Sequence, residues 1–145
     1  MASPLSRKTI NNKSAAVCGV IRLMMNKEDD LISTWIEYHS HNNDSDFWAF
    51  EQLEEFVQSE PEKAWECIIK IMDMSSSDSV LGNLSAGPLE DLLFYHGSKF
   101  IDRVETLTRQ NPKFTKLIKG VWASEMQKNI KEKIVTLQER YANIV

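Results

Sequence analysis

The residues most able to do chemistry gather in one stretch of this sequence, between positions 86 and 109. Glu90 and Asp91 are adjacent carboxylates, His96 follows them, and Arg103 lies further along. Carboxylates beside a histidine can transfer protons, and an arginine can stabilise developing negative charge. One hypothesis is therefore a small hydrolase-like enzyme with its site around Glu90, Asp91 and His96.

A structural interpretation of the same residues is favoured. His96 continues the apolar stripe of Leu89, Leu92 and Leu93 near the end of a predicted helix, where an imidazole can donate to a backbone carbonyl. Carboxylates in a first helical turn usually stabilise the positive end of the helix dipole. We therefore expect no catalytic residue here, and we interpret the following residues as a structural hairpin: Gly87, Pro88, Glu90, Asp91, His96, Gly97 and Arg103.

The hairpin is predicted to consist of two antiparallel helices, over about 88–96 and 99–109. Gly87 would cap the first helix, and Pro88 would be its first residue, where the missing N–H is harmless. Gly97 would end that helix in a left-handed conformation.

The hairpin also predicts an ion pair between its two helices. Antiparallel packing would place Glu90 and Asp91 near Arg103 or Arg109. Such a pair would fix the register of the hairpin.

Metal and cofactor chemistry finds little support in the sequence. His39, His41, Asp44 and Asp46 could be interpreted as metal ligands, but zinc needs three or four converging ligands held by rigid elements. A loop rich in Asn, Asp and Ser more often forms a turn and a helix cap. No nucleotide-binding, zinc-protease or serine-hydrolase motif occurs, and the two cysteines lack metal-site spacing. We expect no cofactor and no metal.

The strongest electrostatic feature is the acidic middle of the chain. Residues 28–66 hold twelve acidic residues and one basic residue, a net charge of −11. Such a surface repels nucleic acid and favours a basic protein partner. The predicted function is a non-enzymatic protein-binding module, by analogy an immunity or antitoxin-type inhibitor. The alternative is that these carboxylates only solvate two helices. The expected partner-binding residues are Glu37, Glu51, Glu54 and Glu55.

Apolar residues recur at helical spacing through most of the chain, and no stretch predicts a strand. Trp122 is expected to plug one end of the core. The predicted class is all-α, with short antiparallel helix pairs in an α-solenoid-like arrangement or an irregular helical bundle. Outside the hairpin, helices are expected at about 28–39, 46–58, 60–73, 79–86, 112–119 and 124–141.

Length predicts a single helical domain over residues 26–145. Residues 1–25 form a basic extension, expected to be partly disordered or a short docked helix, and Met24 or Met25 is an alternative start. No apolar run is long enough to span a membrane, so we expect a cytoplasmic protein. The oligomeric state stays open, and a homo-oligomeric structural protein assembled through the last helix is a further hypothesis.

One resemblance adds to these predictions. The run LSAGPLEDLLFYHGSKFIDRVE, with PEKAWECIIKIM before it and NPKFTKLIKGVW after it, resembles a bacterial family of small helical proteins catalogued as a domain of unknown function. The signature is AGPLEDLL followed by HG, and the resemblance covers about residues 50–122. It implies a compact helical fold and a bacterial source, and it implies no reaction.

Overall fold

The computed structural model describes residues 27–143, and all regular structure in that range is helical. The predicted all-α class is therefore confirmed. The chain divides into a unit of residues 1–31 and a unit of residues 32–145. The predicted N-terminal extension, with its two candidate start methionines, lies outside the described residues. No helix among the described residues is long and apolar enough to cross a membrane.

Seven α-helices and two short helical turns make up the described range. The helices fall within a few residues of the predicted ones, except around the central hairpin. They are α2 (Lys27–His41), α3 (Phe47–Ser59), α4 (Pro61–Met74), α5 (Asp78–Leu84), α6 (Glu90–Gln110), α7 (Pro112–Lys119) and α8 (Lys128–Arg140), with a 3₁₀ turn η1 (Asp44–Asp46) and a π-helical turn η2 (Ser85–Leu89).

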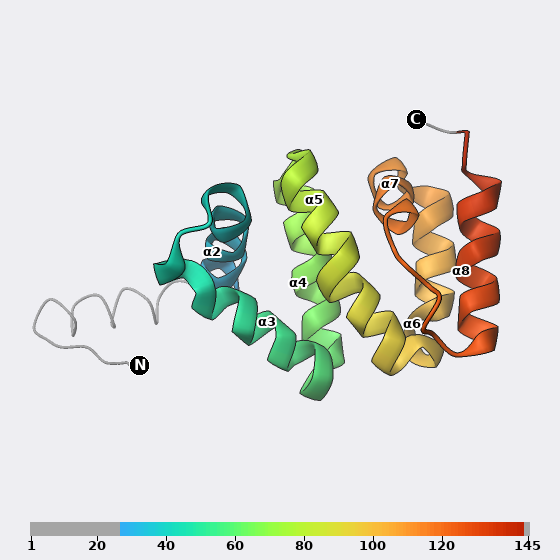
Figure 1. Ribbon diagram of the computed structural model, residues 1–145, viewed down its shortest axis with the longest axis horizontal. Helices are drawn as coiled ribbons and strands as arrows, with labels where there is room; N and C mark the ends of the chain where they lie inside the picture. Colours follow the sequence, from blue (N-terminus) through green and yellow to red (C-terminus); the bar gives the residue numbers. More distant parts are fainter. Residues whose placement is uncertain (1–26, 144–145) are drawn as a thin grey trace, which may run out of the picture. The chain divides into compact units, whose positions relative to one another are not determined.

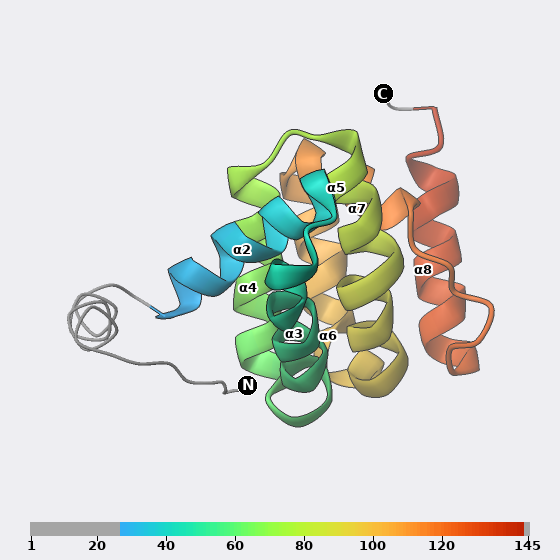
Figure 2. The same cartoon turned by 60° about the vertical axis from the view of Figure 1, so that its left-hand side comes forward.

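Within the larger unit, the first helices form antiparallel neighbours. Figures 1 and 2 show α3 and α4 running in opposite directions, and the chain from α5 into α6 running opposite to α4. α6 contacts α3, α4, α7 and α8, so it is the central element of this unit. The predicted antiparallel pairing therefore holds from α3 into the first part of α6, whereas α8 runs in the same direction as the last part of α6 (Figure 1).

The start of the predicted hairpin is wrong in one respect, because no helix begins at Pro88. Ser77 caps the helix instead, accepting a hydrogen bond from the Val80 N–H at 3.3 Å, and the chain stays helical from Asp78 onwards. Pro88 lacks an N–H and would clash with a carbonyl of a regular α-helix. The π-helical turn η2 accommodates the proline, and the Glu90 N–H bonds to the Ser85 carbonyl across the wider turn.

The reversal of the hairpin occurs within α6, at His96. The backbone of His96 is non-helical (φ −134°, ψ 27°) and separates two helical segments. Figures 1 and 2 show the second segment returning alongside the first. Gly97 is not the predicted left-handed stop, since no glycine in the described range has a positive φ.

A close approach explains the glycine at position 97. A Cβ at this position would lie 2.9 Å from Cγ1 and 3.0 Å from Cγ2 of Ile130, which belongs to α8. Only a residue without a side chain lets α8 pack this closely against the turn of α6. Gly97 therefore serves helix packing.

The predicted ion pair across the hairpin is also wrong. Arg103 donates two hydrogen bonds to the Glu62 carboxylate of α4, at 2.8 and 2.7 Å. Lys99 adds a weaker ion pair to Glu62 at 3.6 Å. Sequence spacing cannot show this preference, because Glu62 lies 41 residues from Arg103 and only packing of α4 on α6 brings them together.

Trp122 does not plug the core, contrary to prediction. Its side chain is 69% exposed, while Val121 and Ala123 on either side are buried. The chain between α7 and α8 has no regular structure here, and burial alternates along residues 121–123. Burial of the two smaller residues therefore turns the tryptophan outward.

We predict that Gly97→Ala lowers the free energy of unfolding by about 1–3 kcal/mol, because the new methyl group meets Ile130 in a packed interior. Gly82→Ala is the matched control: its Cβ would meet nothing within 4 Å, and it should stabilise α5 by roughly 0.5–1 kcal/mol. Urea unfolding of both variants measures these effects. Equal effects at the two positions would contradict the close approach.

Candidate functional site

A surface pocket of about 240 Å³ lies between α6 and the connection from α7 to α8. It contains three carboxylates, three aromatic side chains and a methionine, and no basic side chain lines it. We call it the acidic–aromatic pocket. Its lining residues are Glu90, Asp91, Phe94, Tyr95, Trp122, Glu125 and Met126.

The aromatic side chains of this pocket are unusually exposed. Phe94 is 46%, Tyr95 53% and Trp122 69% exposed, and the first two rings make an edge-to-face contact with centroids 5.0 Å apart. Leu92 and Leu93 fill the buried face of α6, so the two following residues project outward. Adjacent exposed aromatic side chains of this size usually mark a contact surface.

Hydrogen bonds fix the connection from α7 to α8, which forms one wall of the pocket. The Glu90 carboxylate accepts a hydrogen bond from the Trp122 backbone N–H at 2.8 Å. Gln138 of α8 donates to the carbonyls of Ile118 and Val121, at 3.0 and 2.7 Å. The exposed ring of Trp122 is therefore carried by a well-anchored backbone.

A pair of carboxyl groups lies at the edge of the pocket, where α3 meets α6. Burial raises the pKa of Glu54 from its ordinary value of 4.5 to about 7, and the charge of Asp91 and a hydrogen bond to it add to the rise. Burial also raises the pKa of Asp91, while its hydrogen bond with Glu54 acts in the opposite direction. Below about pH 7, Glu54 therefore carries the proton of this pair, and Asp91 accepts a hydrogen bond from it.

His96 makes a contact of the kind that the structural interpretation predicts. Its Nε2 donates to the Val57 carbonyl of α3 at 2.8 Å, and the ring is half-buried. His96 does not line the acidic–aromatic pocket, which contains Glu90 and Asp91. The three residues of the enzyme hypothesis therefore do not converge on one cavity.

The four glutamates predicted to bind a partner differ in their surroundings. Glu51 and Glu55 are exposed on α3, as expected of a contact surface. Glu54 turns towards Asp91 instead, because it shares the face of α3 that packs on α6. Glu37 is exposed on α2 but pairs with His41 at 2.6 Å.

The histidines and aspartates around residue 40 do not converge either. His39 packs its ring on Trp35, with centroids 4.0 Å apart, and burial lowers its pKa. Asn43 caps the short turn η1 by accepting from the Ser45 N–H. Between residues 27 and 143, no group of three or more His, Cys, Asp or Glu side chains is placed to hold a metal ion.

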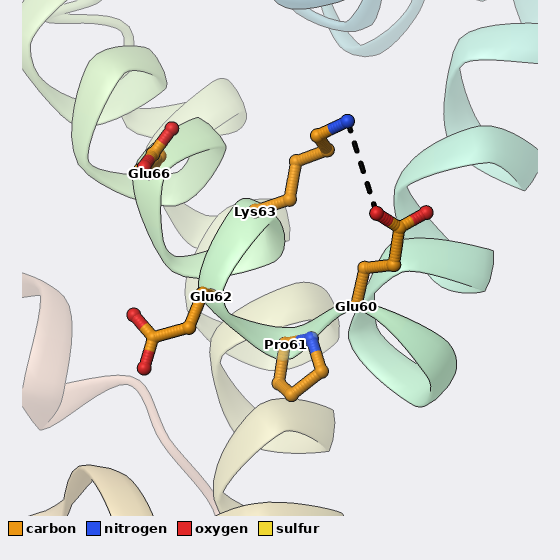
Figure 3. Close-up of a pocket in the computed structure, with 5 residues that line it drawn as sticks. All are labelled: Glu60, Pro61, Glu62, Lys63 and Glu66. Carbon is orange, nitrogen blue, oxygen red and sulfur yellow. Dashed lines mark ion pairs between the residues drawn. The ribbon is translucent and has the colours of Figure 1, made fainter.

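A second hollow, of about 340 Å³, lies at the start of α4 (Figure 3). Two of its three carboxylates already have basic partners. Lys63 pairs with Glu60 at 3.8 Å, and Glu62, which points away from that pair in Figure 3, binds Arg103. The acidic–aromatic pocket is different, since no ion pair joins its carboxylates to a basic side chain within the described residues.

Sequence reasoning missed five residues of the pocket (Phe94, Tyr95, Trp122, Glu125 and Met126), and part of the signal was available. Phe94 and Tyr95 fall outside the apolar stripe that Leu89, Leu92 and Leu93 define, which indicates exposure. Nothing in the sequence places Trp122 or Glu125 beside α6, because their position depends on the irregular connection between α7 and α8.

The fold and the pocket define an all-α protein with an exposed acidic–aromatic surface. Residues 37–142 match the Family of unknown function (DUF6869), and the chain belongs to this family. The match agrees with the predicted resemblance to a domain of unknown function and extends beyond residues 50–122 on both sides. The AGPLEDLL signature and a bacterial source stay predictions. No curated protein and no solved structure matches the chain.

The carboxyl pair predicts a pH dependence of stability. Because the pKa of Glu54 is higher in the folded chain than in the unfolded chain, its contribution to the free energy of unfolding is fully present below pH 4.5 and is lost as the pH rises through about 7.

Glu54→Gln keeps a hydrogen-bond donor but cannot ionise. We expect this variant to melt a few degrees above the parent at pH 8, and the difference to shrink towards pH 5. Thermal unfolding at several pH values, with Glu51→Gln as control, measures it. Parallel melting curves of parent and Glu54→Gln at every pH would contradict a shared proton.

Proposed function

We propose that this chain is a protein-binding module that recognises a basic partner through its acidic–aromatic pocket. The observation that supports the proposal is the exposure of Phe94, Tyr95 and Trp122 beside three carboxylates, with no basic side chain among the described residues that line the pocket. An immunity or antitoxin-type inhibitor is one class of protein with this profile.

The aromatic side chains supply the binding energy in this proposal. Tryptophan and tyrosine dominate the energetics of many interfaces, because they bury a large area at a small cost in side-chain entropy. Trp122 is more exposed than the other large apolar side chains described, and its backbone is fixed by Glu90. A partner that covers this ring gains contact area without having to order the chain that carries it.

The carboxylates supply charge complementarity. Glu90, Asp91 and Glu125 surround the aromatic side chains of the pocket. Opposite charge on a partner would raise the association rate and reject acidic competitors. Negative charge here also disfavours nucleic acid.

Acid–base catalysis is the second candidate function, and the carboxyl pair favours it. A carboxyl group whose pKa is raised to about 7 can donate or accept a proton near neutral pH, and its partner Asp91 lines the pocket. The binding proposal remains better supported, because His96, the base of the enzyme hypothesis, is hydrogen-bonded to the Val57 carbonyl and does not line the pocket.

We predict that partner binding depends on the pocket. The intact chain and the variant Trp122→Ala/Glu125→Lys are immobilised, and proteins captured from the native cell are compared by quantitative mass spectrometry. A basic protein should be captured by the parent and reduced at least tenfold on the variant. The substituted side chains are exposed, so the fold should be unchanged by circular dichroism.

The matched control is Trp48→Ala/Glu51→Lys, which alters an exposed tryptophan and an exposed glutamate on α3. This control should capture the partner as well as the parent does. If the pocket variant keeps every partner, the proposed function is wrong. If only the α3 control loses the partner, the binding surface lies on α3.

A further inference from the structure

We propose that the acidic–aromatic pocket binds the side chain of a single arginine from the partner, with its guanidinium against Trp122 and Tyr95 and paired with the pocket carboxylates. The inference rests on the proposed function and names the chemistry that the site recognises. Three properties of the pocket support it.

The first property is size. At about 240 Å³ the pocket is smaller than the range of roughly 300–1,000 Å³ that is usual for cofactor and drug-sized ligands. It suits one side chain better than a cofactor. A folded partner would then anchor one residue here and place the rest of its interface around the rim.

The second property is the exposed aromatic surface. The negative face of an aromatic ring attracts a cation within about 6 Å of its centroid, and tryptophan attracts most strongly. The chain already uses this contact elsewhere, since Arg103 lies 4.8 Å from the ring centroid of Phe100. In the pocket the same chemistry is open to a partner, because Tyr95 and Trp122 are 53% and 69% exposed.

The third property is uncompensated negative charge. Glu90, Asp91 and Glu125 line the pocket, no basic side chain is among its lining residues, and Glu125 is exposed at the rim. A planar guanidinium can stack on a ring and bond to a carboxylate at the same time, which an ammonium group does less well. Arginine therefore fits this combination of groups better than lysine.

Nuclear magnetic resonance titration of the ¹⁵N-labelled full chain tests the assignment. The probes are N-acetyl-argininamide, N-acetyl-lysinamide and N-acetyl-citrullinamide, the last being a neutral analogue of arginine. We expect a saturable shift of the Trp122 indole N–H with the arginine probe, and about tenfold weaker binding of the citrulline probe. The indole of Trp48, on α3, is the internal reference and should not move.

Two variants make the test specific. Glu125→Gln should weaken the arginine probe several-fold, while Glu66→Gln, at an exposed site on α4, should leave it unchanged. Trp122→Ala should remove the saturable shift at Tyr95. Equal binding of the arginine and citrulline probes would overturn the assignment, and so would equal binding of the lysine probe.

Failure of this inference can be separated from failure of the proposed function. If the arginine probe does not bind, but capture of a basic partner still depends on Trp122, the arginine assignment is wrong and the binding surface stands. If the arginine probe binds as expected but no partner depends on the pocket, the arginine assignment stands and the proposed function is wrong.

Discussion

The reversal of α6 at His96 is the constraint on which the rest of the larger unit depends. Two contacts from opposite sides hold it. The His96 ring donates to the Val57 carbonyl of α3. Gly97 has no Cβ, and this lets the Ile130 side chain of α8 pack closely against its backbone. The turn therefore joins α3 and α8 through α6, and it explains why one histidine and one glycine stand side by side here.

The same reversal produces the exposed surface. The helical segments on the two sides of His96 bury Leu92, Leu93, Phe100 and Ile101, and the last turn before His96 leaves Phe94 and Tyr95 exposed. The connection from α7 to α8 then brings Trp122 to the same place, fixed by Glu90. A rigid scaffold presenting aromatic side chains among carboxylates is an arrangement suited to binding, because little order has to be gained on association.

Helix positions could be predicted from the sequence because apolar spacing and capping residues act locally. Asn111 before Pro112 is an example, since its side chain accepts from the Lys113 and Phe114 N–H groups as expected of a cap. Features that depend on packing could not be predicted. A π-helical turn accommodates Pro88, and Arg103 pairs with Glu62, which is distant in the sequence. Glu54, which was predicted to bind a partner, is hydrogen-bonded to Asp91 instead. The pocket was missed for the same reason, because one of its walls is the irregular connection from α7 to α8, which has no periodicity.

The central claim is that a partner covers the acidic–aromatic pocket. The footprint of the captured partner, measured by hydroxyl-radical labelling of this chain alone and in complex, tests it most directly. Aromatic side chains react readily, and Tyr95 and Trp122 are both exposed in the isolated chain. The account predicts that these two residues lose reactivity in the complex, while Trp48 keeps it. Protection confined to α3, with Trp122 still fully reactive, would contradict the account.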